Sequence, residues 1–322
     1  MSWNRRNNIL ILASLTLIIS AGIYLTWPRT PAHLRLVVST TTSLYDTGVL
    51  DEIEGTFEAE YPIDIYFISV GTGLAIQHAR RGDADMILVH APAREFSFLE
   101  EGYGVNRKIV AYNYFSIIGP AEDPASIRYL PPTQALEAIV EGGERGEALW
   151  VSRGDDSGTH SKENELWAAA GFDPSILRDE GWYRESGTGM GKTLQITEEF
   201  GAYTLTDMGT YLKYSEEGLI DLIVLVGAGR ELINVYSAIA VNPEVSPDAN
   251  FEGAMTFIGF LISEEGQGIF ADYGVEDYGV NLFNPAVSLL ESRFDPEIAG
   301  WIEAAAFHEG SECHESFRVD AG

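Results

Sequence analysis

The stretch "VVSTTTSLYDTG" (Val37–Gly48) joins an apolar run to five consecutive hydroxylated residues, Ser39 to Ser43. The apolar run predicts a buried strand, and the segment after the turn has the apolar spacing of a helix. The hydroxyls therefore follow the carboxyl end of a strand and precede the first turn of a helix. Helix N-termini present unpaired backbone N–H groups, so this turn offers many hydrogen-bond donors in a small volume.

The pattern around this stretch predicts a parallel α/β sheet. Strand-like and helix-like segments alternate, and that order favours parallel strands with right-handed crossovers. The expected strands are 34–40, 63–73 and 84–92, and the helices between them are 48–61 and 74–83.

The second half of the chain repeats the alternation and adds two unusually long strands. The long strands are expected at 109–119 and 232–242, and a strand, a Gly/Ser-rich turn and a helix are expected within 148–172. An apolar helix is expected at 250–270. The tail after about Ser292 predicts one added helix and a loose end.

Length and charge limit the classes of protein. The chain has 322 residues, more than one hydrophobic core usually organises, so two lobes are expected. Its formal net charge of −29 disfavours nucleic acid as a partner. The acidic surface, with only four lysines among the 20 basic residues, also suits a salty medium in which screening relieves self-repulsion.

The N-terminal segment predicts a membrane anchor or a signal peptide. Arg5 and Arg6 precede an uncharged run from Ile9 to Trp27, close to the length that spans a bilayer. The flanking arginines place the body of the protein outside the cytoplasm. We favour an uncleaved anchor within residues 1–30, and a cleaved signal is the alternative. The only cysteine, Cys313, is far from this segment, so lipidation of a cysteine beside the segment is excluded. A single cysteine also means that the chain has no intrachain disulfide.

Three strand ends share the chemistry of the opening stretch. They are "STTTS" (39–43), "SVGTG" (69–73) and "SRGDDSGTH" (152–160). Each turn alone could simply cap its helix. Together, at the carboxyl ends of strands in an α/β pattern, they predict an anion site, because ligands of open α/β sheets bind at that edge.

Arg153 is the one guanidinium within these turns. Arginine can hold an oxyanion by charge-assisted hydrogen bonds. The alternative is an ion pair with Asp155 or Asp156. An anion nearby requires both carboxylates to point away, and that orientation is the expectation.

Other motifs give weaker signals. "ESGTGMGKT" (185–193) has Ser186 where a phosphate loop needs glycine, and the polar "DEGWYRE" before it predicts no buried strand. His308, Cys313 and His314 match no standard zinc spacing. No "GxSxG" nucleophile elbow occurs, so an enzyme is not expected.

Five longer segments resemble the tungstate-binding proteins of ABC transporters. They are "TTTSLYDTGVLD", "VGTGLAIQHARRGDADMILVHAP", "EGYGVNRKIVAYNYFSIIGP", "SRGDDSGTHSKENELW" and "ESGTGMGKTLQITEEFGAYTLTDMGTYL". They occur in the family's order and cover about Leu34 to Pro285, nearly the whole part after the anchor. Lys192 departs from the pattern, which usually has a small apolar residue there.

The resemblance implies a two-lobed periplasmic-binding-protein type II fold. One lobe would combine 34–111 with 240–290, the other would span 112–239, and 291–322 would be a tail that the resemblance does not cover. The implied function is extracellular or periplasmic capture of tungstate or molybdate for an ABC permease, with no cofactor. The protein would be membrane-anchored or secreted.

The implied ligand is a tetrahedral dianion without a proton at neutral pH, so its site should offer donors only. We expect the donors from one lobe to be Thr41, Thr42, Ser43 and Thr72, and those from the other to be Ser152, Arg153 and Thr159. Molybdate, sulfate or phosphate is an alternative ligand, and an anchored oxyanion sensor is an alternative function. The choice between tungstate and molybdate stays open, because the two ions are nearly the same size.

Overall fold

The computed structural model describes residues 34–227 and 229–320. Residues from Leu34 onward form one compact unit. The predicted anchor or signal within residues 1–30 lies outside the described residues. Within the described ranges, no helix is both long enough and apolar enough to cross a bilayer.

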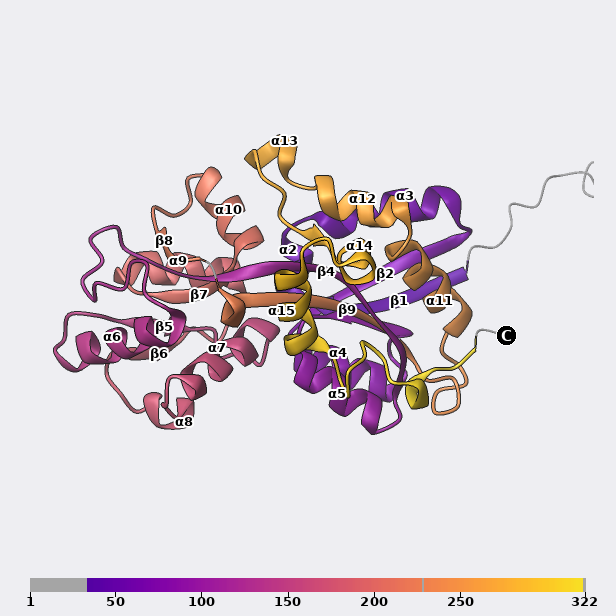
Figure 1. Cartoon of the computed structure of the whole chain (residues 1–322), viewed down its shortest axis with the longest axis horizontal. Helices are drawn as coiled ribbons and strands as arrows, with labels where there is room; N and C mark the ends of the chain where they lie inside the picture. The colour runs from indigo at the N-terminus through magenta and orange to yellow at the C-terminus, as the bar shows by residue number, and fades with distance from the viewer. Residues whose placement is uncertain (1–33, 228, 321–322) are drawn as a thin grey trace, which may run out of the picture. The chain divides into compact units, whose positions relative to one another are not determined.

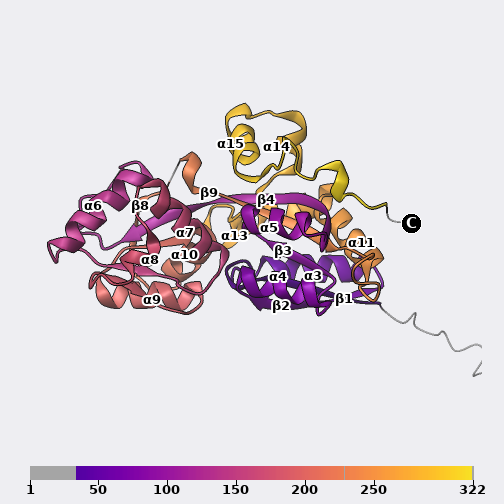
Figure 2. The same cartoon turned by 90° about the horizontal axis from the view of Figure 1, so that it is seen from below.

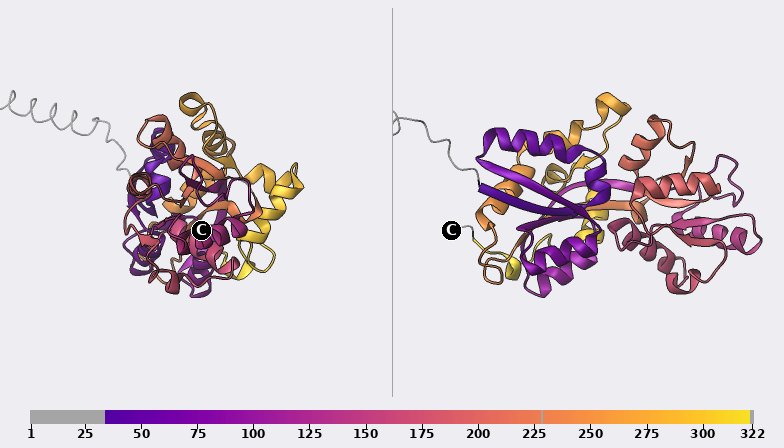
Figure 3. Two further views of the ribbon diagram at one scale, coloured as in Figure 1. Left: turned by 90° about the vertical axis from the view of Figure 1, so that its left-hand side faces the viewer. Right: turned by 180° about the vertical axis from the view of Figure 1, so that it is seen from behind.

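Figure 1 shows two α/β lobes joined by long strands. In the first lobe, β1 pairs in parallel with both β2 and β3, as the alternating pattern predicts. Helices lie on both sides of these strands, as the view from behind shows (Figure 3). The strands and the helices that connect them are β1 (Leu34–Thr41), α2 (Thr42–Asp46), α3 (Val49–Glu60), β2 (Ile63–Val70), α4 (Thr72–Arg81), β3 (Met86–Val89) and α5 (Pro92–Glu100).

The core of the first lobe is completed by helices from much later in the chain. These are α11 (Phe251–Leu261) and α12 (Glu264–Asp272). Phe57 of α3 packs edge-on against Phe257 of α11, with ring centroids 5.0 Å apart. The return of the chain to the first lobe after the second lobe is what the resemblance implied.

The predicted long strands are β4 (Gly104–Gly119) and β9 (Ile233–Val241). They pair antiparallel, with Ile109 opposite Ser237 and Tyr114 opposite Ile233. In the second lobe β4 continues into pairing with β7 (Thr204–Asp207) and β8 (Ile223–Val226). These two strands therefore connect the lobes, and the predicted two-lobed α/β fold is confirmed.

The second lobe is built around buried tryptophans. Trp150 and Trp167 pack edge-on with ring centroids 5.2 Å apart. No buried strand was expected before the Gly-rich turn; a short strand, β6 (Tyr183–Glu185), does lead into it, but only its first residue, Tyr183, is buried. Parallel pairing with β5 forms this strand in spite of its polar sequence. The elements are α6 (Pro132–Glu144), β5 (Trp150–Ser152), α7 (Gly158–Ala169), α8 (Pro174–Leu177), β6 (Tyr183–Glu185), α9 (Met190–Phe200), β7 (Thr204–Asp207), α10 (Met208–Glu216), β8 (Ile223–Val226) and η1 (Arg230–Leu232).

The tail is ordered, so the expected loose end was wrong. Its predicted added helix is α15 (Pro296–Ala306), which together with the preceding α14 (Val287–Ser292) covers one face of β4 and β9 (Figure 2). Beyond α15, the buried guanidinium of Arg107 donates from Nη1 to the carbonyls of Ala306 and Glu312, both at 2.8 Å. Asn106 and Val319 exchange two further hydrogen bonds. The last elements are α13 (Val275–Tyr278), β10 (Asn284–Pro285), α14 (Val287–Ser292), α15 (Pro296–Ala306) and η2 (Glu315–Phe317).

Candidate functional site

The three hydroxyl-rich turns meet between the lobes. Thr42 begins α2 and Thr72 begins α4, both in the first lobe, and Gly158 begins α7 in the second. The N–H of Gly73 donates to the carbonyl of Asp156 at 3.4 Å, from one lobe to the other. The turns therefore bring the N-termini of three helices to one place, which favours an anion.

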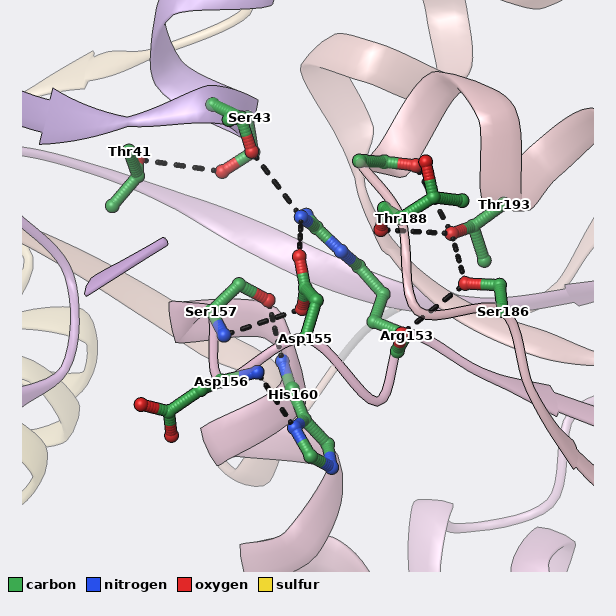
Figure 4. Close-up of polar contacts among 12 residues, drawn as sticks. Thr41, Ser43, Arg153, Asp155, Asp156, Ser157, His160, Ser186, Thr188 and Thr193 are labelled. Carbon is green, nitrogen blue, oxygen red and sulfur yellow. Dashed lines mark hydrogen bonds and ion pairs between the residues drawn. The ribbon is translucent and has the colours of Figure 1, made fainter. Parts of the chain in front are cut away.

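Arg153 lies at the centre of this meeting point (Figure 4). The strand β5 ends one residue before it, and its side chain is fully buried. Nη2 donates to the Thr42 hydroxyl at 3.2 Å and pairs with the Asp155 carboxylate. The other two nitrogens, Nε and Nη1, are buried without a hydrogen-bond partner among the described residues. A buried guanidinium with two unused donors is costly unless an acceptor binds there.

Thr72 and Thr159 show the same feature. Each is completely buried, and each hydroxyl lacks a hydrogen-bond partner within the described part of the chain. Thr72 comes from the first lobe and Thr159 from the second, and both lie in the first turn of their helices. Native proteins satisfy nearly all buried hydroxyls, so two such groups on turns that meet between the lobes indicate a ligand with acceptor atoms.

Thr41 and Ser43 are already partly engaged. The Thr41 hydroxyl caps α2 by accepting from the Leu44 N–H at 3.4 Å, as the capping alternative expected. The same hydroxyl lies 3.5 Å from the Ser43 hydroxyl, which in turn lies 3.2 Å from His90 Nε2.

The tautomer of His90 follows from its neighbours. Both hydrogens of the Asn234 side-chain amide are used, because its nitrogen donates to Asn113 and to the Tyr236 hydroxyl. The Asn234 oxygen, 2.9 Å from His90 Nδ1, must therefore accept, which places the imidazole proton on Nδ1. Burial lowers the pKa of His90 to about 4. Nε2 of the neutral ring then accepts the hydroxyl proton of Ser43.

The Ser152 hydroxyl is occupied. It donates to Glu163 Oε2 at 3.0 Å. Glu163 is fully buried and also accepts from Trp150 and Tyr183 through Oε1. Burial raises the pKa of Glu163, and these hydrogen bonds oppose that rise. The sequence placed the Ser152 hydroxyl among the ligand donors, but in this arrangement its proton goes to a carboxylate.

The expectation for the two acidic residues was half wrong. Asp155 does not point away, because it pairs with Arg153 and its Oδ1 accepts from the Ser157 N–H at 3.2 Å. Spacing alone had allowed this pair as an alternative. Asp156 does point away from Arg153, as Figure 4 shows, and its carboxylate pairs with Arg94 in the first lobe.

The Gly-rich turn at 185–193 contacts the main chain of Arg153. The Ser186 hydroxyl lies 3.2 Å from the Arg153 carbonyl and 2.8 Å from the Thr193 hydroxyl. Sequence reasoning missed this supporting role, since only the fold places residues 33 positions apart in contact. Lys192, the residue that departs from the family pattern, is exposed to water, and its Nζ lies 3.5 Å from Gln195 Oε1.

His308 and His314 of the tail contact protein groups. No group of three or more metal-ligating side chains occurs within 34–227 and 229–320. His308 lies 3.2 Å from Glu100 and its ring stacks on Phe96.

Taken together, the fold and the site define a class: a two-lobed binding protein with hydrogen-bond donors converging between its lobes. The chain matches the model of the PBP superfamily domain over residues 28–265. It belongs to that superfamily and, within it, to the family of TupA tungstate-binding proteins, as its relatives show.

Three relatives illustrate the family. A Haloferax volcanii protein, whose name assigns it to anion binding in an ABC transporter, is 47% identical to this chain. The matched region covers 78% of this chain and 72% of the length of the Haloferax protein. The tungstate-binding protein TupA of Peptoclostridium acidaminophilum is 38% identical over 80% of this chain and 87% of its own. The solved structure of TupA from Desulfovibrio alaskensis is 38% identical, covers 78% of this chain and 98% of its own, and superposes with a TM-score of 0.66.

Proposed function

We propose that this protein captures tungstate outside the cytoplasm and delivers it to the permease of an ABC transporter. Relatives named as tungstate-binding proteins support this ligand. They are binding proteins, so we assign no catalytic activity to this chain. Molybdate, of the same shape and charge, is the competitor that fits the same site.

One observation carries the proposal: four buried donor atoms, all on turns that meet between the lobes, have no acceptor among the described residues. They are Thr72 Oγ1, Thr159 Oγ1, and Nε and Nη1 of Arg153. Tungstate at neutral pH has four acceptor oxygens and no proton to donate, so it can use every one of these donors. Hydrogenphosphate carries a proton that needs an acceptor, and the Asp155 carboxylate beside Arg153 is already engaged by the Arg153 guanidinium and by the Ser157 N–H.

We propose Thr42, Thr72, Arg153 and Thr159 as donors through their side chains. Thr42 accepts from Arg153, so its own hydroxyl proton remains available. Ser43 joins them by turning its proton from His90 to the ion, and Thr41 contributes from the N-cap position of α2. The Ser152 hydroxyl donates to Glu163, so we restrict Ser152 to its main chain.

In this proposal the anion bridges the lobes. We propose lobe boundaries of 34–111 with 240–290, and of 112–239, with 291–322 as the tail. The ion would then touch Thr42 and Thr72 of one lobe and Arg153 and Thr159 of the other. A ligand that contacts both lobes binds the closed state better and shifts the population toward it.

We further propose that residues 1–30 tether the protein to the membrane. The tether would keep the binding lobes on the extracellular or periplasmic face, near the permease. This proposal is supported by the uncharged run from Ile9 to Trp27, which follows Arg5 and Arg6 in the sequence.

The test is calorimetric titration of the purified protein with tungstate, molybdate, sulfate and phosphate. Six or seven charge-assisted bonds of about 1.5–3 kcal/mol each, less the costs of ordering and closure, place a nanomolar Kd near the upper end of what the site can give. We expect tungstate to bind far more tightly than sulfate or phosphate. Tighter binding of phosphate than of tungstate would overturn the proposal.

A further inference from the structure

Asp156 is held by the first lobe although it belongs to the second. It lies in the turn between β5 and α7 with a left-handed φ of 59°. Its own N–H donates to His160 Nδ1 at 3.1 Å, which ties the turn to α7. Its carbonyl and its carboxylate both face the first lobe.

Arg94 of α5 contacts both of these groups. Its Nη1 donates to the Asp156 carbonyl at 3.2 Å, and its Nη2 pairs with the Asp156 carboxylate. The same carbonyl also accepts from the N–H of Gly73 at 3.4 Å. Asp156 thus accepts three hydrogen bonds from two helices of the other lobe.

The first lobe is shaped to receive Asp156. A Cβ added to Gly73 would lie 1.9 Å from Asp156 Oδ2 and 3.0 Å from Arg94 Nη1. Any side chain at position 73 would therefore displace the ion pair. Glycine at this position of α4 leaves the room that the contact needs.

We propose that Arg94 and Asp156 form a latch that holds the lobes closed and slows release of the anion. The proposal rests on the proposed function for the identity of the ion but not for the contact itself. The latch contacts join different lobes, so they exist only when the lobes are closed. A contact present in one state alone shifts the equilibrium toward that state, and the apparent affinity for the ion rises with the closed population.

The latch is not part of the anion site. The Asp156 carboxylate points away from the Arg153 guanidinium (Figure 4). A negative charge this close to an anion site should weaken anion binding if it acted through charge alone. Charge alone therefore predicts that Asp156→Asn tightens binding of tungstate, whereas the latch predicts that it weakens binding.

The experiment measures the Kd and the dissociation rate of tungstate for R94Q, D156N and the double variant. We expect each single variant to raise both quantities roughly three- to tenfold, since the latch combines a part-exposed ion pair with a hydrogen bond to a carbonyl. The double variant should lose no more than the larger single loss, because the two residues act through one contact.

A matched control is available within the first lobe. Arg80 pairs with Glu101, and the side chain of Arg80 is 34% exposed, as that of Arg94 is. This pair does not cross between lobes, so R80Q and E101Q should leave both quantities unchanged. Equal effects of R94Q and R80Q, or tighter binding by D156N, would overturn the latch.

Failure of the latch can be told apart from failure of the proposed function. If the wild-type protein does not bind tungstate, the ligand is wrong, and small-angle X-ray scattering of the anion-free variants still tests the latch. R94Q and D156N should then have a larger radius of gyration than wild type and R80Q. Identical radii would contradict the latch.

Discussion

The guanidinium of Arg153 in the second lobe donates to the hydroxyl of Thr42 in the first, at 3.2 Å. This hydrogen bond joins two of the three turns that the sequence singled out. It also orients Thr42, because a hydroxyl that accepts from arginine keeps its own proton for another acceptor. The pair therefore prepares donors from both lobes for one ion.

Replacing Arg153 should abolish tight binding. Arg153→Ala removes the two unpaired donors Nε and Nη1 together with a buried positive charge. At about 1.5–3 kcal/mol for each charge-assisted bond, the loss should be about 3–6 kcal/mol, or at least roughly 100-fold in Kd by calorimetry. Arg128→Ala is the control, since Arg128 is an exposed arginine of the same lobe. Wild-type affinity of the Arg153 variant would remove this residue from the site.

The orphan hydroxyls give a sharper test. Thr72→Val and Thr159→Val delete hydroxyls that have no partner in the described structure, so the anion-free protein should keep its free energy of unfolding. Each variant should nevertheless bind tungstate about 10- to 100-fold more weakly, the equivalent of one charge-assisted bond. Urea unfolding and calorimetry measure the two quantities.

Thr197→Val is the matched control for these variants. The Thr197 hydroxyl is equally buried but donates to the Thr193 carbonyl at 2.8 Å. Its removal should lower stability and leave the Kd of tungstate near the wild-type value. The reverse pattern, with destabilised Thr72 and Thr159 variants that bind normally, would mean that both hydroxyls serve the fold.

The buried His90 should make stability depend on pH. Burial lowers its pKa from 6.5 to about 4 in the folded protein, so the unfolded chain binds more protons between these values. The contribution of neutral His90 is therefore present above pH 6.5 and is lost as the pH falls toward 4. Full loss amounts to about 3 kcal/mol at 1.36 kcal/mol per pKa unit.

His90→Gln isolates this effect in urea unfolding at pH 7, 5.5 and 4.5. Burial raises the pKa of Glu95, Glu163 and Asp207, so these groups shift stability in the opposite direction as the pH falls. Wild type and His90→Gln both contain these groups, so their contributions cancel in the difference between the two free energies of unfolding. Wild type should lose stability relative to His90→Gln as the pH falls, and parallel pH profiles would contradict a neutral buried His90.

The tail should stabilise the first lobe without contributing to anion binding. Ending the chain after Leu290 removes α15, uncovers Ile109, Ile233 and Val235, and takes both carbonyl partners from Arg107. We expect a loss of more than about 3 kcal/mol in the free energy of unfolding, with the Kd of tungstate unchanged where the protein is still folded.

A chain that ends after Cys313 is the control for the tail. It keeps α15 and the Arg107 contacts. It loses the pairing of Asn106 with Val319, the hydrogen bonds from Arg318 to the Cys313 carbonyl and the partly buried side chains of Phe317 and Val319. It should be nearly as stable as the full-length protein. Equal stability of all three chains would show that the tail does not support the fold.

The acidic surface should make the protein more stable in salt. With a net charge of −29, self-repulsion opposes the folded state, and added salt screens it. The melting temperature should therefore rise from low to molar KCl. A flat or falling melting temperature would contradict this explanation of the composition.

The sequence predicted the alternating α/β elements and the hydroxyl-rich turns because both depend on local patterns, whereas the arrangement of the two lobes was implied by the family resemblance. Apolar runs specify β1 and the long strands β4 and β9, and hydroxyls before helices specify the turns that hold Thr72 and Thr159. Arg153 was predicted because it is the one guanidinium in those turns. The hydroxyl-rich strand ends therefore indicated the turns that meet between the lobes.

Contacts between distant residues could not be read from these patterns. The Ser152 hydroxyl faces Glu163, Ser43 faces His90, and Asp156 faces Arg94, which is 62 positions away in the chain. Each of these pairs depends on how helices pack on the sheet or on how the lobes meet. Composition and spacing say which groups can donate, and only the fold says which partners they have.

The most direct test is a crystal of the protein soaked in tungstate, with the tungsten located by anomalous scattering. We predict one strong peak between the lobes, with oxygens of the ion within hydrogen-bond distance of Arg153, Thr72 and Thr159. A tungsten peak elsewhere, with these three side chains still lacking partners, would contradict the account.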